Sequence, residues 1–242
     1  MNKDLIKQRF SKNLKTYNAN AKIQKKMAQK LSDLIENKNH KKILEIGCGT
    51  GFLTQLINDK LKFELYKTID IVEECQSYIN TINPEIKFIS DDIENYLNNS
   101  TEKFDLIISN ATLQWINDFE NIIKKLQQRL NHNGELIFTT FGTENFREIY
   151  HILGTRLNYY SQQELEKMFP DSFIEQEIHI MAFNSPKDVL KHLRLTGVNA
   201  IENIHWTKKD LTNFENGYSN LCARRVTLTY NPVYIRILCP LG

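Results

Sequence analysis

The chain of 242 residues is 41% hydrophobic and 25% charged, so it can bury a full core in one domain that carries insertions. Its formal net charge of +2 gives no general reason to expect binding to nucleic acid or to a membrane surface. The four cysteines and six histidines show neither C-x-x-C pairing nor metal-ligand spacing, so neither a disulfide framework nor a zinc site is indicated.

Helical sequence is expected over residues 4–37, in two pieces with a break near residues 18–20. Phe10, Tyr17 and Gln24 are spaced by seven, so on continuous helix they would lie nearly on one face. The polar tips of the tyrosine and the glutamine could face a ligand. A buried tyrosine bonded to a carbonyl group, beside a surface glutamine, explains the spacing equally well.

The segment 42–51, K-I-L-E-I-G-C-G-T-G, is the strongest motif in the chain. Residues 43–46 are typical of a central parallel strand that is covered on both faces. The three glycines that follow allow a tight turn, close approach of the backbone to a ligand, and entry into a helix at Phe52. No G-K-[ST] follows, which argues against a P-loop. The turn alone would suit a dinucleotide, a phosphate or S-adenosylmethionine.

After this turn the sequence alternates strand and helix, which predicts parallel strands joined by right-handed crossovers. The expected elements are helix 52–59, strand 63–69, helix 73–81, strand 86–90, strand 104–109, helix 119–130 and strand 135–140. Polar or aromatic residues follow three of these strands, namely Asp70, Asp92 and the pair Asn110 and Trp115. Ligands of open parallel sheets bind at the carboxyl ends of strands, so these side chains are candidates for a binding crevice. Trp115 could equally pack under the next helix.

The second half departs from this alternation. A helix is expected over residues 159–169, and strands over 172–183 and 226–238, with Pro232 marking a bulge or an edge position. The intervening insert, residues 185–225, reads as helical and should fold over the sheet.

The motif E-I-G-C-G-T-G from Glu45 resembles motif I of the class I S-adenosylmethionine-dependent methyltransferases. Other segments resemble more narrowly the malonyl-acyl-carrier-protein O-methyltransferases of biotin synthesis, and the resemblance covers nearly the whole chain. The segments that carry it are Phe10, Tyr17-Asn18, Ala21, Gln24, S-N-A-T-L-Q-W from Ser109, T-T-F-G from Thr139, L-R-L-T-G-V-N-A from Leu193 and L-T-Y from Leu228. The segment from Ser109 is less specific, because trans-aconitate methyltransferase carries a similar one.

The resemblance implies an α/β fold, a doubly wound, seven-stranded, mostly parallel Rossmann-like sheet with N-terminal helices and a helical insert that form a lid. It implies one methyltransferase domain over residues 1–242, with lid helices in 1–40, an S-adenosylmethionine-binding half in 41–142, and a C-terminal half in 143–242.

The resemblance also assigns a site. Asp70 would hold the cofactor ribose, and Asp92 the adenine amino group with help from Ile93. The full set of implied cofactor-binding residues is Gln24, Glu45, Gly47, Cys48, Gly49, Gly51, Asp70, Ile71, Asp92, Ile93, Asn110 and Trp115.

The implied reaction is methyl transfer to the free carboxylate of malonyl-acyl carrier protein. A carboxylate is already ionised at neutral pH, so no general base is required. Tyr17 is expected over the reacting centre, and a guanidinium, from Arg147 or Arg194, is expected on the second carboxylate oxygen. Either arginine could equally be a solvated surface residue.

The remaining expectations concern partners and location. We expect a cytoplasmic monomer that uses no metal, nucleic acid or membrane and acts on a malonyl group carried by acyl carrier protein or coenzyme A. On helix 186–195, Lys187, Lys191 and Arg194 share one face that could steer an acidic carrier, although it could be merely solvated. Two alternatives stay open: a methyltransferase of small carboxylates, and a protein that binds S-adenosylmethionine without catalysis.

Overall fold

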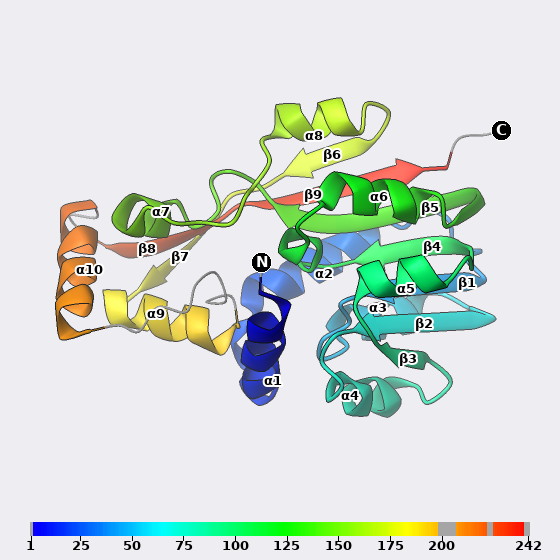
Figure 1. The fold of residues 1–242 in the computed structure, drawn as a ribbon, viewed down its shortest axis with the longest axis horizontal. Coiled ribbons are helices and arrows are strands. Elements are labelled where there is room, and N and C mark those ends of the chain that lie inside the picture. Colours follow the sequence, from blue (N-terminus) through cyan, green and yellow to red (C-terminus); the bar gives the residue numbers. More distant parts are fainter. Residues whose placement is uncertain (1, 198–206, 222–224, 240–242) are drawn as a thin grey trace.

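A computed structural model describes residues 2–197, 207–221 and 225–239 of the chain (Figure 1). The helices are α1 (Lys3–Asn20), α2 (Lys22–Asp33), α3 (Phe52–Lys60), α4 (Cys75–Ile82), α5 (Ile93–Asn99), α6 (Phe119–Gln127), α7 (Arg147–Leu153), α8 (Gln162–Met168), α9 (Pro186–Leu195) and α10 (Lys208–Leu221). The strands are β1 (Lys42–Ile46), β2 (Leu65–Asp70), β3 (Lys87–Ser90), β4 (Phe104–Ser109), β5 (Leu130–Phe141), β6 (Phe173–Gln176), β7 (His179–Phe183), β8 (Val226–Tyr230) and β9 (Pro232–Leu238).

The main sheet has seven strands in the order β3-β2-β1-β4-β5-β9-β6. Strands β1 to β5 pair in parallel, and β9 runs antiparallel to both β5 and β6. Successive residues of β4 serve two cores, with Leu106 and Ile108 in one and Ile107 in the other. Helices therefore cover both faces of the sheet (Figure 1). The predicted doubly wound, mostly parallel sheet is confirmed.

The two long strands expected in the second half are each broken, which corrects the prediction. β6 and β9 lie in the main sheet, whereas β7 and β8 form a separate antiparallel pair. Asn231 stands at the break, where its Nδ2 donates to the backbone oxygen of Glu177 at 2.9 Å and its Oδ1 accepts from the backbone N–H of Glu144 at 3.2 Å. Pro232 begins β9 and so marks the break, not a sheet edge.

Two short helices, α5 and α7, were not expected from the sequence. Asp92 caps α5, because its Oδ1 accepts from the backbone N–H of Glu94 at 2.9 Å. The N-terminal helix breaks at Ala21, one residue beyond the predicted region. None of the helices in the described parts of the chain is long and apolar enough to cross a membrane.

Helix α1 stands between the carboxyl ends of the parallel strands and the unit formed by β7, β8, α9 and α10 (Figure 1). It packs against α9, and the ring of Phe10 lies close to Gly197, where an added Cβ would be 3.2 Å from it. Of the predicted insert, residues 198–206 and 222–224 lie outside the described residues, and most of the remainder forms α9 and α10. The N-terminal helices and the insert thus meet over the edge of the sheet where a ligand is expected.

Candidate functional site

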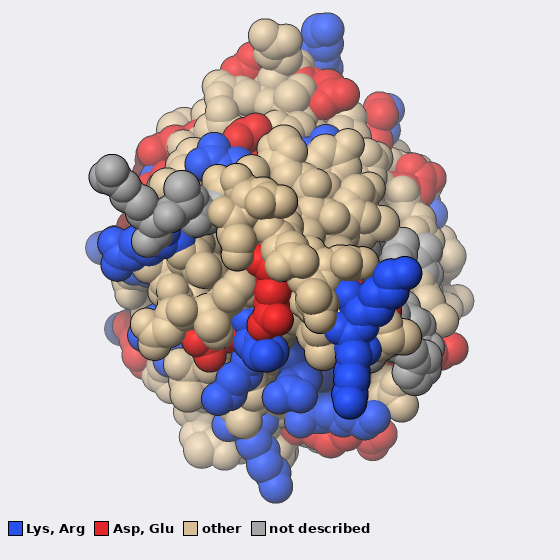
Figure 2. Space-filling model, turned by 90° about the vertical axis from the view of Figure 1, so that its left-hand side faces the viewer, with Lys and Arg blue, Asp and Glu red and all other residues tan. Residues whose placement is uncertain are grey.

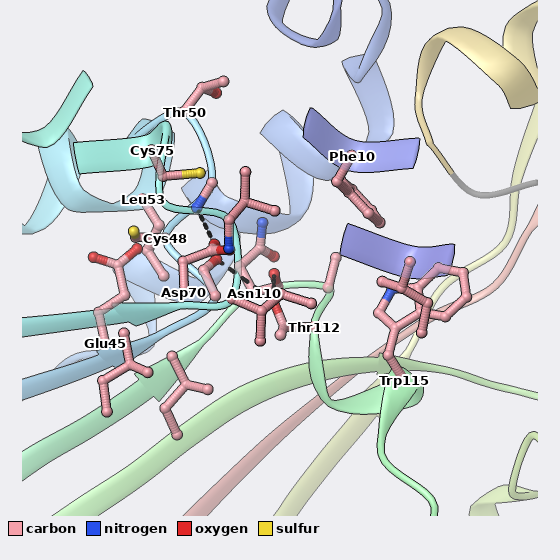
Figure 3. Close-up of a pocket in the computed structure, with 18 of the residues that line it drawn as sticks. Phe10, Glu45, Cys48, Thr50, Leu53, Asp70, Cys75, Asn110, Thr112 and Trp115 are labelled. Atoms are coloured by element: carbon pink, nitrogen blue, oxygen red, sulfur yellow. Dashed lines mark hydrogen bonds between the residues drawn. The ribbon is translucent and has the colours of Figure 1, made fainter. Parts of the chain in front are cut away.

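A cavity opens at the carboxyl ends of β1, β2 and β4, with α1 and α2 above it (Figure 3). Its floor is the glycine turn, in which Gly47, Gly49 and Gly51 all have positive φ. The backbone N–H of Gly47 donates to the oxygen of Ile69 at 2.7 Å, which fixes the start of the turn against β2. This hydrogen bond anchors the glycine turn to the end of β2.

Asp70 ends β2 and joins the glycine turn to the next loop. Its two oxygens accept from the backbone N–H groups of Gly49 at 2.8 Å and Val72 at 2.9 Å (Figure 3). Burial raises the pKa of Asp70, although the N–H groups of Val72, Gly49 and Ile71 oppose the rise. The carboxylate keeps unused acceptor capacity toward the cavity, which suits a ligand that brings hydroxyl donors.

Glu45 is the penultimate residue of β1 and is 1% exposed. Its Oε2 accepts from the hydroxyl groups of Tyr66 at 2.6 Å and Thr54 at 2.8 Å. Burial raises the pKa of Glu45 to about 7, against these hydrogen bonds and with a contribution from the charge of Asp70. Two carboxylates that repel each other in one cavity favour a cationic ligand, because a positive charge would relieve both.

Two further cavity residues, Asn110 and Asp92, already have side-chain partners within the protein. The side chain of Asn110 links α2 to β5. Its Nδ2 donates to the backbone oxygen of Gln24 at 3.0 Å, and its Oδ1 accepts from the Thr139 hydroxyl at 2.9 Å. Asp92, besides capping α5, pairs with Lys3 at 3.0 Å. Asn110 thus reaches a ligand mainly through its backbone.

Most of the residues proposed for the site from the sequence come together here. Those that line the cavity are Tyr17, Gln24, Glu45, Gly47, Cys48, Gly49, Asp70, Ile71, Asp92, Ile93, Asn110 and Trp115. Three do not: Gly51, whose added Cβ would meet Ile82 at 2.3 Å, and the exposed residues Arg147 and Arg194. Arg147 pairs with Glu144 at 3.2 Å. The roles of all fifteen residues stay predictions.

Sequence reasoning missed several lining residues, among them Asn18 and Thr50 as a pair. The hydroxyl of Thr50 in the glycine turn donates to Asn18 Oδ1 at 2.6 Å, which ties α1 to the turn. Both residues stood in segments already singled out, but only the fold brings them together. Among the described residues, no group of three or more potential metal-ligating side chains is assembled.

Comparison with known proteins identifies the relatives of the chain. A family model described as a methyltransferase domain matches residues 19–172. A malonyl-[acyl-carrier protein] O-methyltransferase of Calditerrivibrio nitroreducens is 40% identical over 94% of both chains. One of Chlorobium luteolum is 35% identical over 96% of this chain and 94% of its own.

A solved structure shares the fold at much lower identity. It is the N-methyltransferase NodS from Bradyrhizobium japonicum, in complex with S-adenosyl-L-homocysteine. It aligns with a TM-score of 0.50 at 16% identity, over 89% of this chain and 85% of that chain.

Proposed function

This chain belongs to the malonyl-[acyl-carrier protein] O-methyltransferase family, and we propose that it transfers the methyl group of S-adenosylmethionine to the free carboxylate of malonyl-acyl carrier protein. The observation that carries the proposal is the near full-length match to relatives of that name. The cavity supports it, because two buried carboxylates suit a ligand with a sulfonium and an ammonium group. As the sequence resemblance implies, the product would start pimeloyl formation in biotin synthesis.

The proposed reaction requires the protein mainly to bind the two reactants and to align them. A malonyl carboxylate is ionised at neutral pH and is itself the nucleophile. The residues of this chain have to hold it in line with the methyl group and keep water away. The wall of the cavity is suited to excluding water: Phe10 packs edge-on to Trp115, with ring centroids 6.1 Å apart, and Ile6 and Leu14 are buried beside them.

A methyl-transfer assay with labelled S-adenosylmethionine tests the proposal. Malonyl-carrier, malonyl-coenzyme A and free diacids are offered in parallel. We expect methyl ester on the malonyl thioesters and none on the free diacids. Turnover of free diacids alone would favour the small-carboxylate alternative, and cofactor binding without any turnover would favour a silent binding protein.

Asp70→Ala should weaken cofactor binding by about 1.5 to 3 kcal/mol, the typical effect of losing a hydrogen bond to a charged group. The backbone N–H of Gly49 would also lose its partner. Calorimetric titration with S-adenosylhomocysteine measures the effect, with Asp70→Asn as a milder variant that keeps an acceptor oxygen. Unchanged affinity in a folded Asp70→Ala protein would remove Asp70 from the cofactor site.

Carrier recognition is the finer part of the proposal. Lysine and arginine side chains gather on the lower half of the face in Figure 2, which is the side of α9 and α10. Exposed basic residues of α9 include Lys191 and Arg194, whereas Lys187 already pairs with Glu215 at 3.1 Å. The charge of Lys22, at the start of α2, helps burial to lower the pKa of His192 in α9, so Lys22 adds a positive charge near this helix. Such a surface would steer an acidic carrier.

Lys191→Glu should raise KM for malonyl-carrier roughly threefold to tenfold, because charge reversal on a docking surface slows association. KM for malonyl-coenzyme A should stay nearly unchanged, since it needs no protein surface. Lys103→Glu reverses the charge of another exposed lysine, just before β4, and serves as the control. Equal effects on both substrates, or an equal effect of the control, would place the carrier elsewhere.

A further inference from the structure

Lys25 of α2 lines the cavity, although no sequence motif singled it out. Its side chain is half-buried, and its Nζ lies 4.9 Å from the centroid of the Phe52 ring. Phe52 begins α3 directly after the glycine turn and lines the cavity as well. The ring holds the ammonium group beside the turn and leaves N–H donors for a hydrogen-bond acceptor. Lys25 can therefore still bind an anion.

The other charges around the cavity leave Lys25 without an anionic partner. Among the described residues that line the cavity, the only other cation is Lys3, whose Nζ lies 3.0 Å from both Asp92 and Glu94. In the part of the chain that the structure describes, the ammonium group of Lys25 contacts the Phe52 ring, and no carboxylate pairs with it. A lysine in this setting is placed to bind an anionic group of the ligand.

The order of the strands indicates which part of the cofactor reaches Lys25. Asp92 follows β3, Asp70 ends β2 and Gly47 follows β1, and these strands are neighbours in that order, with β4 next. A cofactor with its adenine at Asp92 and its ribose at Asp70 therefore directs its amino-acid end toward the ends of β1 and β4. Figure 3 shows Asp70 beside Asn110, the residue that follows β4.

Two contacts place Lys25 near the ends of β1 and β4. Phe52, which its ammonium group contacts, begins the helix that follows β1 and the glycine turn. Gln24, the preceding residue of α2, accepts through its backbone oxygen from Asn110 Nδ2 at 3.0 Å. The ammonium group thus lies on the side of the cavity toward which the amino-acid end of the cofactor points.

That end of the cofactor carries a carboxylate as well as an ammonium group. The buried carboxylates of Glu45 and Asp70 suit the ammonium and the sulfonium, but they would repel the carboxylate of the ligand. The carboxylate therefore needs a cation of its own in this cavity. Lys25 is the described lining residue that can supply it, because Lys3 is already paired.

We propose that Lys25 binds the carboxylate at the amino-acid end of the cofactor. The inference rests on the proposed function, because it takes S-adenosylmethionine as the ligand. Lysine carries a compact charge on a flexible stem, so the ammonium group can turn from the Phe52 ring toward a carboxylate oxygen. With the adenine held at one end and the carboxylate at the other, the sulfonium between them has a fixed place for methyl transfer.

The test compares S-adenosylmethionine with its decarboxylated analogue, which differ by this carboxylate. Their dissociation constants are measured by calorimetry without an acceptor, so that no transfer occurs. The parent should bind the complete cofactor about tenfold more tightly, or better. Lys25→Met, which keeps an unbranched side chain beside Phe52, should reduce that preference to about twofold or less. Lys25→Arg should keep most of it, because the charge remains.

The matched control is Lys26→Met. Lys26 is the next residue of α2, it is exposed, and it does not line the cavity. The substitution removes the same charge, so the preference should equal that of the parent. Affinity for methylthioadenosine, which lacks the whole amino-acid end, should stay within about twofold in every variant and reports that each is folded.

A second pair of ligands separates the two carboxylates of the reaction. Malonyl-coenzyme A and acetyl-coenzyme A are titrated into enzyme saturated with S-adenosylhomocysteine. Lys25→Met should leave the preference for the malonyl thioester unchanged. If it loses this preference and keeps that for the complete cofactor, Lys25 binds the carboxylate of the acceptor and the inference is wrong.

Three further results would overturn the inference. The parent could bind both forms of the cofactor equally, Lys25→Met could keep the preference, or Lys26→Met could reduce it as much as Lys25→Met. Each of these leaves the proposed function standing if the parent methylates a malonyl thioester. A parent that binds no S-adenosylmethionine would instead refute the proposed function, and the inference with it.

Discussion

Gly47→Ala is expected to weaken cofactor binding by roughly one hundredfold or more, equivalent to about 3 kcal/mol. Gly47 has φ +72°, a conformation that disfavours any side chain. An added Cβ would lie 2.1 Å from Oγ1 and 2.4 Å from Cγ2 of Thr112. The turn or the loop after β4 must therefore move, and both form the wall of the cavity.

Two other glycines provide matched controls. Gly49 has φ +52° and Gly154 has φ +71°, and an added Cβ meets nothing within 4 Å at either. Gly49→Ala should show the backbone effect alone, about 1 to 2 kcal/mol, at the same site. Gly154→Ala, outside the cavity, should lower stability without changing cofactor affinity. Calorimetric affinities and denaturant midpoints for the three variants separate these effects. If Gly47→Ala binds as well as Gly49→Ala, the contact with Thr112 is not important.

The second prediction concerns pH. Cofactor affinity should be nearly constant above pH 7 and fall about tenfold per unit below it, to about one hundredfold at pH 5. The cause is Glu45, whose pKa near 7 in the free protein should drop when a cationic cofactor binds. Binding then releases a proton, and the protein binds worst where Glu45 is already protonated.

The sign for stability is opposite. Because the folded protein raises the pKa of Glu45 above its unfolded value, this group stabilises the free protein below about pH 4.5. That contribution is lost as pH rises toward 7. The cofactor should therefore raise Tm more at pH 8 than at pH 5.5.

Glu45→Gln should flatten the affinity profile, leaving only the contribution of Asp70. Titrations in buffers of different ionisation enthalpy count the released proton. S-adenosylhomocysteine, which lacks the sulfonium charge, should show a shallower dependence. A steep profile that survives Glu45→Gln would assign the titration to another group.

The sheet was predictable because its signals are local. Residues 43–46 and 104–109 are mainly apolar segments bounded by glycine or polar residues, and both form strands close to the expected limits. The breaks at Glu177 and Asn231 were not predictable. They depend on a hydrogen bond between residues 54 positions apart, and no local pattern distinguishes a strand that changes sheets from one that continues.

The site shows the same limit. Glycine turns and strand-end acids are readable, since topology places them at one edge. The arginines were chosen for their chemistry alone, and the fold exposes Arg147 and Arg194 outside the cavity. Conversely, no local pattern indicates that His192 and Tyr230 are in contact. Their side chains lie 2.7 Å apart, although 38 positions separate them in the sequence.

The place of β9 in the sheet bears on how the chain reaches its fold during synthesis. Among the described residues, β9 is the strand that is made last, yet it lies between β5 and β6. Until it arrives, β5 presents an unpaired edge and β6 has no neighbour in the sheet. The glycine turn and the five parallel strands can assemble before the rest of the chain is made. The edge of β5 then stays unpaired while about ninety further residues, those between β5 and β9, are synthesised. Cofactor binding to that early half would favour its compact form before the insert has been made.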